Sequence, residues 1–313
     1  MSVWAAAVFE PGFFSNGPVQ LALEAGGVVA VVSAVVGVFT VVRGQSFAGH
    51  ALSDIGTVGG SGAFLAGVSP LLGFVVVNLA GAATMELLGV RRPRGRDVAT
   101  GIVLGAALGL AALFLYWDTT VRSTTGATVT VLFGSLFTIS SGVVPALAIL
   151  SAVSLVGIAV LYRPLLLSSL DPDMAAARGV PVRTVGVGFL LVLAVAVSMS
   201  SVVVGAILST ALLIGPAATA LRLTRRLGLA MVAAAGIGLA VTWLGVLLAY
   251  DSYYWPPAHQ GWPVSFFVVA LVFVLYVAVD VASSWWRRRA GTRTGTGPVV
   301  TLPPATPGTC SPA

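Results

Sequence analysis

One pair of chemically capable side chains stands out in an otherwise apolar sequence. His50 and Asp54 lie four residues apart in a Gly/Ser-rich segment that runs from about Phe47 to Leu65. On a helix this spacing places both side chains on one face. Imidazole nitrogen and carboxylate oxygen are ligands that zinc accepts at about 2.0–2.2 Å, so the pair is a candidate metal site. Spacing alone leaves a plainer alternative open, in which the two residues only hydrogen-bond to each other or to a neighbouring helix.

Three further residues carry groups that can ionise or bind a metal ion. Glu24 lies early in the first apolar run, where charge costs about 2.5–3.5 kcal/mol on insertion scales; we take it as a candidate pathway residue, although a packing or outer-interface position explains it more simply. His259 falls in a predicted outside loop, where it would either receive metal from a delivery protein or simply be solvated. The single cysteine, Cys310, can form no internal disulfide and no metal cage by itself.

The surrounding composition is that of a membrane protein. The 313 residues are 58% hydrophobic and 8% charged, with a mean hydropathy of +1.02, whereas a soluble domain carries about 25% charged residues. Apolar residues fall in repeated runs of about 20, the length that crosses a bilayer as a helix. The sequence therefore predicts an all-α polytopic transmembrane protein with eight to nine spanning helices, embedded in a lipid bilayer.

The positive charge sets orientation rather than a nucleic-acid surface. All the basic residues are arginines, and most cluster in short segments at 91–96, 178–183, 222–226 and 287–289. By the positive-inside rule these segments are cytoplasmic, and the loops 117–126 and 251–262 lie outside. Nine crossings then place the N-terminus outside; the count falls to eight if one segment is re-entrant. We divide the chain into an interfacial segment, 1–18, a transmembrane domain, 19–286, and a disordered cytoplasmic tail, 287–313, and expect no nucleic-acid partner.

A polar segment after residue 170 has the signals of a short, well-specified helix. Asp171 is a good N-cap, Pro172 suits the first helical position, Asp173 complements the positive end of the helix, and Gly179 suits its C-terminal cap. So short a helix in a cytoplasmic loop frays unless it docks on a partner. An ordinary ordered connector is the alternative.

Four stretches, taken in order, resemble the metal-ion ABC permease family that serves zinc, manganese and iron(II) uptake. They are residues 41–54, 132–140, 171–180 and 203–220, of which the last, with its Leu-Leu-Ile-Gly-Pro-Ala-Ala-Thr-Ala run, is the most specific. The resemblance covers roughly residues 13–281. The family shows aspartate first and histidine four residues later, whereas here His50 precedes Asp54, which leaves the preference between zinc and manganese open.

The resemblance implies roles for particular residues. It implies a metal-pathway role for His50 and Asp54, and an ATPase-coupling role for the helix at 171–178. The residues that it implicates in coupling are Asp171, Pro172, Asp173, Ala176, Arg178 and Gly179; Gly205, Gly215 and Pro216 are implicated in the pathway or its packing.

The function that follows is that of the permease subunit of a bacterial ABC importer in the inner membrane. Zinc is the expected cargo because histidine suits zinc better than harder cations; manganese or iron(II) is the alternative. No permanently bound cofactor is expected. The implied partners are a pair of cytoplasmic ATP-binding subunits, an extracytoplasmic metal-binding protein and a second copy of the permease. The chain has no GxxxxGK[ST] loop, so we do not expect it to hydrolyse ATP.

Two other classes are less consistent with the sequence. An ion-coupled secondary transporter should show inverted repeats with paired broken helices, and no convincing internal repeat is present. An intramembrane enzyme should carry a motif such as HExxH or clustered catalytic residues, and the sequence has neither.

Overall fold

In the computed structural model, residues 13–89, 96–121, 126–134, 136–255 and 261–291 are described. Within these ranges all regular structure is helical. The elements are η1 (Phe13–Ser15), α2 (Gly17–Val42), α3 (Ser46–Ala66), α4 (Pro70–Gly89), α5 (Arg96–Val121), α6 (Ala127–Phe133), η3 (Leu136–Thr138), α7 (Val144–Leu170), α8 (Pro172–Ala177), α9 (Val182–Val204), α10 (Ser209–Leu223), α11 (Leu227–Ser252) and α12 (Val264–Gly291). His259, Cys310 and most of the predicted tail lie outside the described residues.

The helices have the lengths and compositions of membrane spans. Among the described residues, six helices are long and apolar enough to cross a bilayer, namely α2, α7, α9, α11, the Leu104–Val121 part of α5 and the Val264–Trp285 part of α12. Shorter apolar helices cover Pro70–Met85 in α4 and Ser209–Leu223 in α10, and α3 is the glycine- and serine-rich exception. A 26-residue helix such as α2 is about 39 Å long at 1.5 Å per residue, enough to cross a hydrocarbon core of about 30 Å. The predicted all-α polytopic class is confirmed.

Helix α7 continues past a charged residue and a proline. Arg163 and Pro164 both lie inside the helix, which ends only at Leu170. The extra turns carry residues that pack into the molecule, since Leu165 and Ser168 are both buried. Burial of this end therefore outweighs the helix-breaking tendency of proline.

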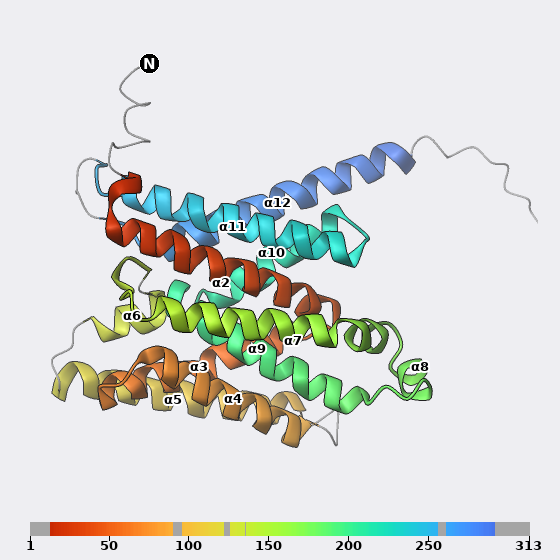
Figure 1. The fold of residues 1–313 in the computed structure, drawn as a ribbon, viewed down its shortest axis with the longest axis horizontal. Helices are drawn as coiled ribbons and strands as arrows, with labels where there is room; N and C mark the ends of the chain where they lie inside the picture. Colours follow the sequence, from red (N-terminus) through yellow and green to blue (C-terminus); the bar gives the residue numbers. More distant parts are fainter. Residues whose placement is uncertain (1–12, 90–95, 122–125, 135, 256–260, 292–313) are drawn as a thin grey trace, which may run out of the picture.

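Two helices form the centre of the arrangement. Helix α2 lies between α7 and α11 (Figure 1) and also contacts α9 and α10, while α9 reaches from α7 to α4. Helices α3, α4 and α5 pack together on the other side of α9. Helix α8 lies at one end of the molecule, and η1 and α6 lie at the opposite end (Figure 1). The charge pattern predicts that the end with α8 is cytoplasmic and that the end with η1 and α6 is external.

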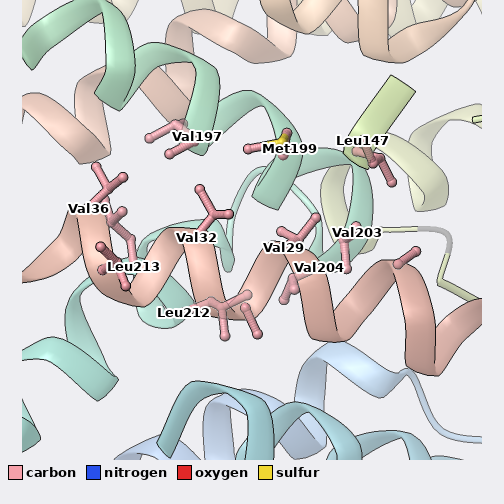
Figure 2. Close-up of a cluster of buried hydrophobic side chains, with 14 of the residues drawn as sticks. Val29, Val32, Val36, Leu147, Val197, Met199, Val203, Val204, Leu212 and Leu213 are labelled. Carbon is pink, nitrogen blue, oxygen red and sulfur yellow. The ribbon is translucent and has the colours of Figure 1, made fainter. Parts of the chain in front are cut away.

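The core is built where α2, α9 and α10 converge. Figure 2 shows valines of α2 facing side chains of α9 and α10, with a leucine of α7 at the side. The fully buried members include Val29, Val32, Val36, Leu147, Val197, Met199, Leu212 and Leu213. Helices α2 and α10 approach to backbone contact, because a Cβ at Gly37 would lie only 1.8 Å from the carbonyl oxygen of Leu213. Such close approach through small residues is how packing replaces the hydrophobic effect between membrane helices.

Candidate metal pathway

The predicted pair lies one to two turns into α3. The distance between His50 Nε2 and Asp54 Oδ2 is 3.6 Å, and the side chains are 52% and 17% exposed. This distance exceeds that of a hydrogen bond, about 2.7–3.2 Å, so the two groups face a shared space without bonding directly. Among the described residues, no group of three or more His, Cys, Asp and Glu side chains could hold a metal ion. The pair therefore offers two ligands, one nitrogen and one oxygen, and no closed cage.

His50 and Asp54 lie on the open side of α3. Phe47, His50, Asp54 and Val58 follow one another at helical spacing, and none of them is buried, whereas most of the rest of the helix is buried. The neighbours that cover the other sides are α4, α5, α9 and α10. We call this open side, defined by Phe47, His50, Asp54 and Val58, the α3 stripe. It leaves both candidate ligands accessible to an ion, to water or to another chain.

The opposite side of α3 is fixed against its neighbours at close range. A Cβ at Gly49 would lie 2.9 Å from Leu213 Cδ2, and one at Gly56 would lie 2.7 Å from Asn78 Oδ1. Ser53, which immediately precedes Asp54, shares a hydrogen bond of 2.6 Å with the hydroxyl of Ser209. These contacts hold the helix so that the α3 stripe is presented from a rigid element.

The Ser53 hydroxyl also donates to the carbonyl oxygen of Ala206, which lies in the break between α9 and α10. The break begins at Gly205, whose φ is +96°. A Cβ at Gly205 would lie 2.3 Å from the carbonyl oxygen of Leu132, and the Ala206 N–H donates to the carbonyl of Val131 at 3.0 Å. Gly205 thus lets two backbone segments cross, and the crossing places unwound backbone beside the α3 segment that carries Asp54.

The structure does not bring the remaining predicted pathway residues to the pair. A Cβ at Gly215 would lie 2.0 Å from Val272 Cγ1, so this glycine packs α10 against α12. Pro216 is buried inside α10. Glu24 is exposed on α2, 18 residues before the last residue of that helix and thus about 27 Å along its axis. A cavity of about 770 Å³ among α2, α7 and α11 includes neither His50 nor Asp54.

A buried polar contact that the sequence analysis missed lies between α4 and α9. The amide of Asn78 donates to the hydroxyl of Ser198 at 2.9 Å, and both residues are fully buried. A second hydroxyl pair, Ser33 and Ser200, joins α2 to α9 at 2.6 Å. The only signal in the sequence is an asparagine inside an apolar run. Its amide needs a hydrogen-bond partner, but the sequence does not identify which residue provides it. These contacts fix α9 relative to α2 and α4.

The predicted coupling segment forms the short helix α8. The carboxylate of Asp171 accepts from the Met174 N–H at 2.9 Å, Asp173 lies in the first turn, and Gly179, with φ +80°, donates to the Ala176 carbonyl at 2.9 Å. Every predicted coupling residue, including Pro172 and Arg178, is exposed. Ala175 is buried and anchors the helix. The segment is therefore locally rigid and presents most of its surface outward.

A half-buried arginine, Arg43, connects the helix end near α8 with the turn that leads into α3. Arg43 Nη1 donates to the hydroxyls of Ser168 at 3.0 Å and Ser169 at 3.4 Å, and its guanidinium lies 5.6 Å from the centre of the Phe189 ring. Burial lowers the pKa of the Arg43 guanidinium from its ordinary value. In the sequence, Arg43 is only one residue of the stretch 41–54 that resembles the family.

Comparison with known proteins identifies the family of this chain. Residues 17–280 match the ABC 3 transport family. The chain is 30% identical to the manganese transport system membrane protein MntC of Listeria innocua over 244 residues, which are 78% of this chain and 85% of the relative. It is 28% identical to a probable iron transport system membrane protein of Haemophilus influenzae, over 81% of this chain and 93% of the relative.

Solved structures share the same architecture. PsaBC from Streptococcus pneumoniae, solved in complex with Fab, superposes with a TM-score of 0.71 at 25% identity, covering 86% of this chain and 92% of that one. An inward-facing metal-chelate type ABC transporter gives a TM-score of 0.67 at 16% identity, over 84% of this chain and 85% of that one, which supports the fold. The chain thus belongs to the ABC 3 transport family, as a multi-pass membrane permease subunit rather than the ATPase.

Proposed function

We propose that this chain forms the membrane pathway of an importer for a divalent metal ion, with His50 and Asp54 as the ligands that the ion meets on its way. The observation that carries the proposal is the pair itself: two metal-binding groups 3.6 Å apart on the accessible α3 stripe of a chain in the ABC 3 transport family. The names of relatives, manganese and iron transport proteins, support a metal cargo.

The same names favour manganese or iron(II) over zinc as the cargo. The expectation of zinc rested on the histidine, because imidazole suits zinc and iron(II) while carboxylate and water suit manganese. The pair, which consists of one imidazole and one carboxylate, does not exclude the harder ions. The open arrangement also fits a transport site, since an ion that is to be released must not be held by a closed set of strong ligands.

A second copy of the permease would complete the site. Two chains related by a twofold axis would present two identical α3 stripes, and water would supply the remaining ligands. A pair of cytoplasmic ATP-binding subunits would dock on the exposed residues of α8, and a metal-binding protein would deliver the ion at the end of the molecule that carries η1 and α6. The exposed, well-capped α8 supports the docking role.

Uptake of radioactive manganese tests this proposal in cells that lack the chromosomal gene and carry it on a plasmid. His50→Ala and Asp54→Ala should each reduce uptake at least about tenfold, because even groups that only orient a metal ligand are worth about 10–100-fold in affinity. Phe47→Ala and Val58→Ala are the matched controls, since they alter the same stripe without removing a ligand. Excess unlabelled iron(II) or zinc in the medium identifies the preferred ion. Normal uptake by both ligand variants would overturn the proposed site.

A further inference from the structure

Arg43 is held in an environment that is unusual for a half-buried cation. Its hydrogen-bond acceptors are the hydroxyls of Ser168 and Ser169, and within the described residues no carboxylate pairs with it. Its Nε atom is buried and has no hydrogen-bond partner there. Two features stabilise the charge in place of an acid. One is the face of the Phe189 ring; the other is the negative ends of two helices, because α2 ends one residue before Arg43 and α7 ends one to two residues past the serines.

On one side, Arg43 holds the segment that leads directly to α8. Asp171 ends α7 and also caps α8, so no flexible linker separates the two helices. Ser168 and Ser169 lie in the last turn of α7, and both hydroxyls also donate to the Leu165 carbonyl, at 3.2 and 2.5 Å. A displacement of α8 must therefore move the hydroxyls that Arg43 binds.

On the other side, Arg43 leads directly to the candidate ligands. Only Gly44 and Gln45 separate it from the first residue of α3, and His50 follows one turn later. The turn is tied to α2, because the Arg43 N–H donates to the Phe39 carbonyl at 2.9 Å and the Gln45 N–H to the Thr40 carbonyl at 2.8 Å. Movement of the guanidinium thus acts on the start of the helix that presents the α3 stripe.

We propose that Arg43 is a positioning residue that transmits displacement of α8 to the His50–Asp54 pair. The two serine hydroxyls, at 3.0 and 3.4 Å, are adjacent acceptors between which the guanidinium shifts as the end of α7 moves, and the Phe189 ring supports it during the shift. The inference rests on the proposed function, because it requires that α8 receives the motion of the ATPase and that the pair meets the metal.

The experiment uses the complete transporter in liposomes and measures ATP hydrolysis and manganese uptake in the same vesicles. The variants are Arg43→Gln, Arg43→Lys and the double variant Ser168→Ala with Ser169→Ala. Arg163→Gln is the matched control, since it removes another arginine at the same end of the molecule, one that is exposed. Thermal unfolding and equilibrium manganese binding are measured on each purified complex.

We expect Arg43→Gln and the double serine variant to lower manganese taken up per ATP hydrolysed at least about fivefold, the lower end of the range for energetically coupled sites. Manganese binding by these variants should stay within about twofold of the intact protein. Arg43→Lys keeps the charge but not the fork of donors, so its uptake per ATP hydrolysed should lie between the values of the intact protein and Arg43→Gln. Arg163→Gln should transport normally.

Three results would overturn the inference. An unchanged ratio of uptake to hydrolysis in Arg43→Gln would show that the arginine transmits nothing. A parallel fall of uptake and of folded protein in Arg43→Gln, with both quantities normal in Arg43→Lys, would show that Arg43 only stabilises the fold. Loss of manganese binding together with uptake would make Arg43 part of the binding site itself. Failure of the intact complex to bind or transport manganese, iron(II) or zinc would instead contradict the proposed function.

Discussion

The contact between α3 and α4 gives a stability prediction that can be worked from the structure. A Cβ at Gly59 would lie 2.1 Å from the carbonyl oxygen of Gly73, 2.6 Å from its carbonyl carbon and 2.9 Å from Val77 Cβ. The nearest atoms belong to backbone, so no side-chain rotation relieves the clash. Gly62 lies one turn later on the same helix, and its Cβ would lie 3.3 Å from the ring of Phe114, which can shift by a few tenths of an ångström.

The two alanine substitutions share one favourable contribution and differ in one unfavourable contribution. Replacing glycine by alanine inside a helix stabilises it by about 0.5–1 kcal/mol. At Gly59 the added atom forces the helices apart, and overpacking of this kind costs about 1–3 kcal/mol, occasionally more. Because backbone must move to relieve the clash, its cost should lie near the upper end of this range. We therefore expect Gly59→Ala to lower the free energy of unfolding by about 2 kcal/mol. Gly62→Ala should be neutral or slightly stabilising.

Equilibrium unfolding of the purified permease in mixed micelles, with increasing denaturing detergent, measures both variants against the intact chain. The difference between Gly59→Ala and Gly62→Ala removes the shared helix contribution and isolates the clash. We expect it to be about 2–3 kcal/mol. If Gly59→Ala proved as stable as Gly62→Ala, the close approach of α3 and α4 would be wrong, and with it the rigid support of the α3 stripe.

Three further predictions concern other contacts. Asp171→Ala removes the cap of α8 and should weaken binding of the ATP-binding subunits by about the 1 kcal/mol that such a cap contributes, measured in a pull-down titration. Asp171→Asn should keep most of the affinity, because asparagine also caps helices. Equal loss of affinity in both variants would mean that the charge of Asp171, not its capping, matters. Asn78→Ala removes the hydrogen bond between α4 and α9 that Ser198 accepts, although the Ser198 hydroxyl still donates to the Ala194 carbonyl. It should lower the free energy of unfolding by about 0.6–1.7 kcal/mol, the range for hydrogen bonds between membrane helices, measured in the same detergent titration; no change would mean that water replaces the amide. Gly205→Ala places a Cβ against the Leu132 carbonyl at a positive φ, so we expect the folded yield in size-exclusion chromatography to fall sharply; a normal yield would contradict the backbone crossing.

The features that the sequence predicted well are those fixed by neighbouring residues. Apolar runs of spanning length gave the helices, and the residues around Asp171 gave the capped α8, since caps depend on side chains within one turn. Helical spacing placed His50 and Asp54 on one face. That this face stays open was not predictable, because it depends on which sides of α3 the other helices cover.

The features that the sequence did not predict join residues far apart in the chain. The contacts of Arg43 with Ser168 and of Asn78 with Ser198 span more than a hundred residues, and no local pattern identifies such partners. The continuation of α7 past Arg163 and Pro164 depends on burial of that end. The zinc expectation relied on one histidine, whereas the relatives described above are named for manganese and iron.

Manganese uptake into liposomes that contain the complete transporter shows whether the ion passes the His50–Asp54 pair. The vesicles hold equal amounts of intact, His50→Ala, Asp54→Ala or Val58→Ala protein, with ATP supplied to the cytoplasmic side. We expect ATP-dependent uptake by the intact and Val58→Ala proteins and at least about a tenfold loss in both ligand variants. Uptake at the intact rate in His50→Ala and Asp54→Ala would contradict the claim that the ion passes this pair.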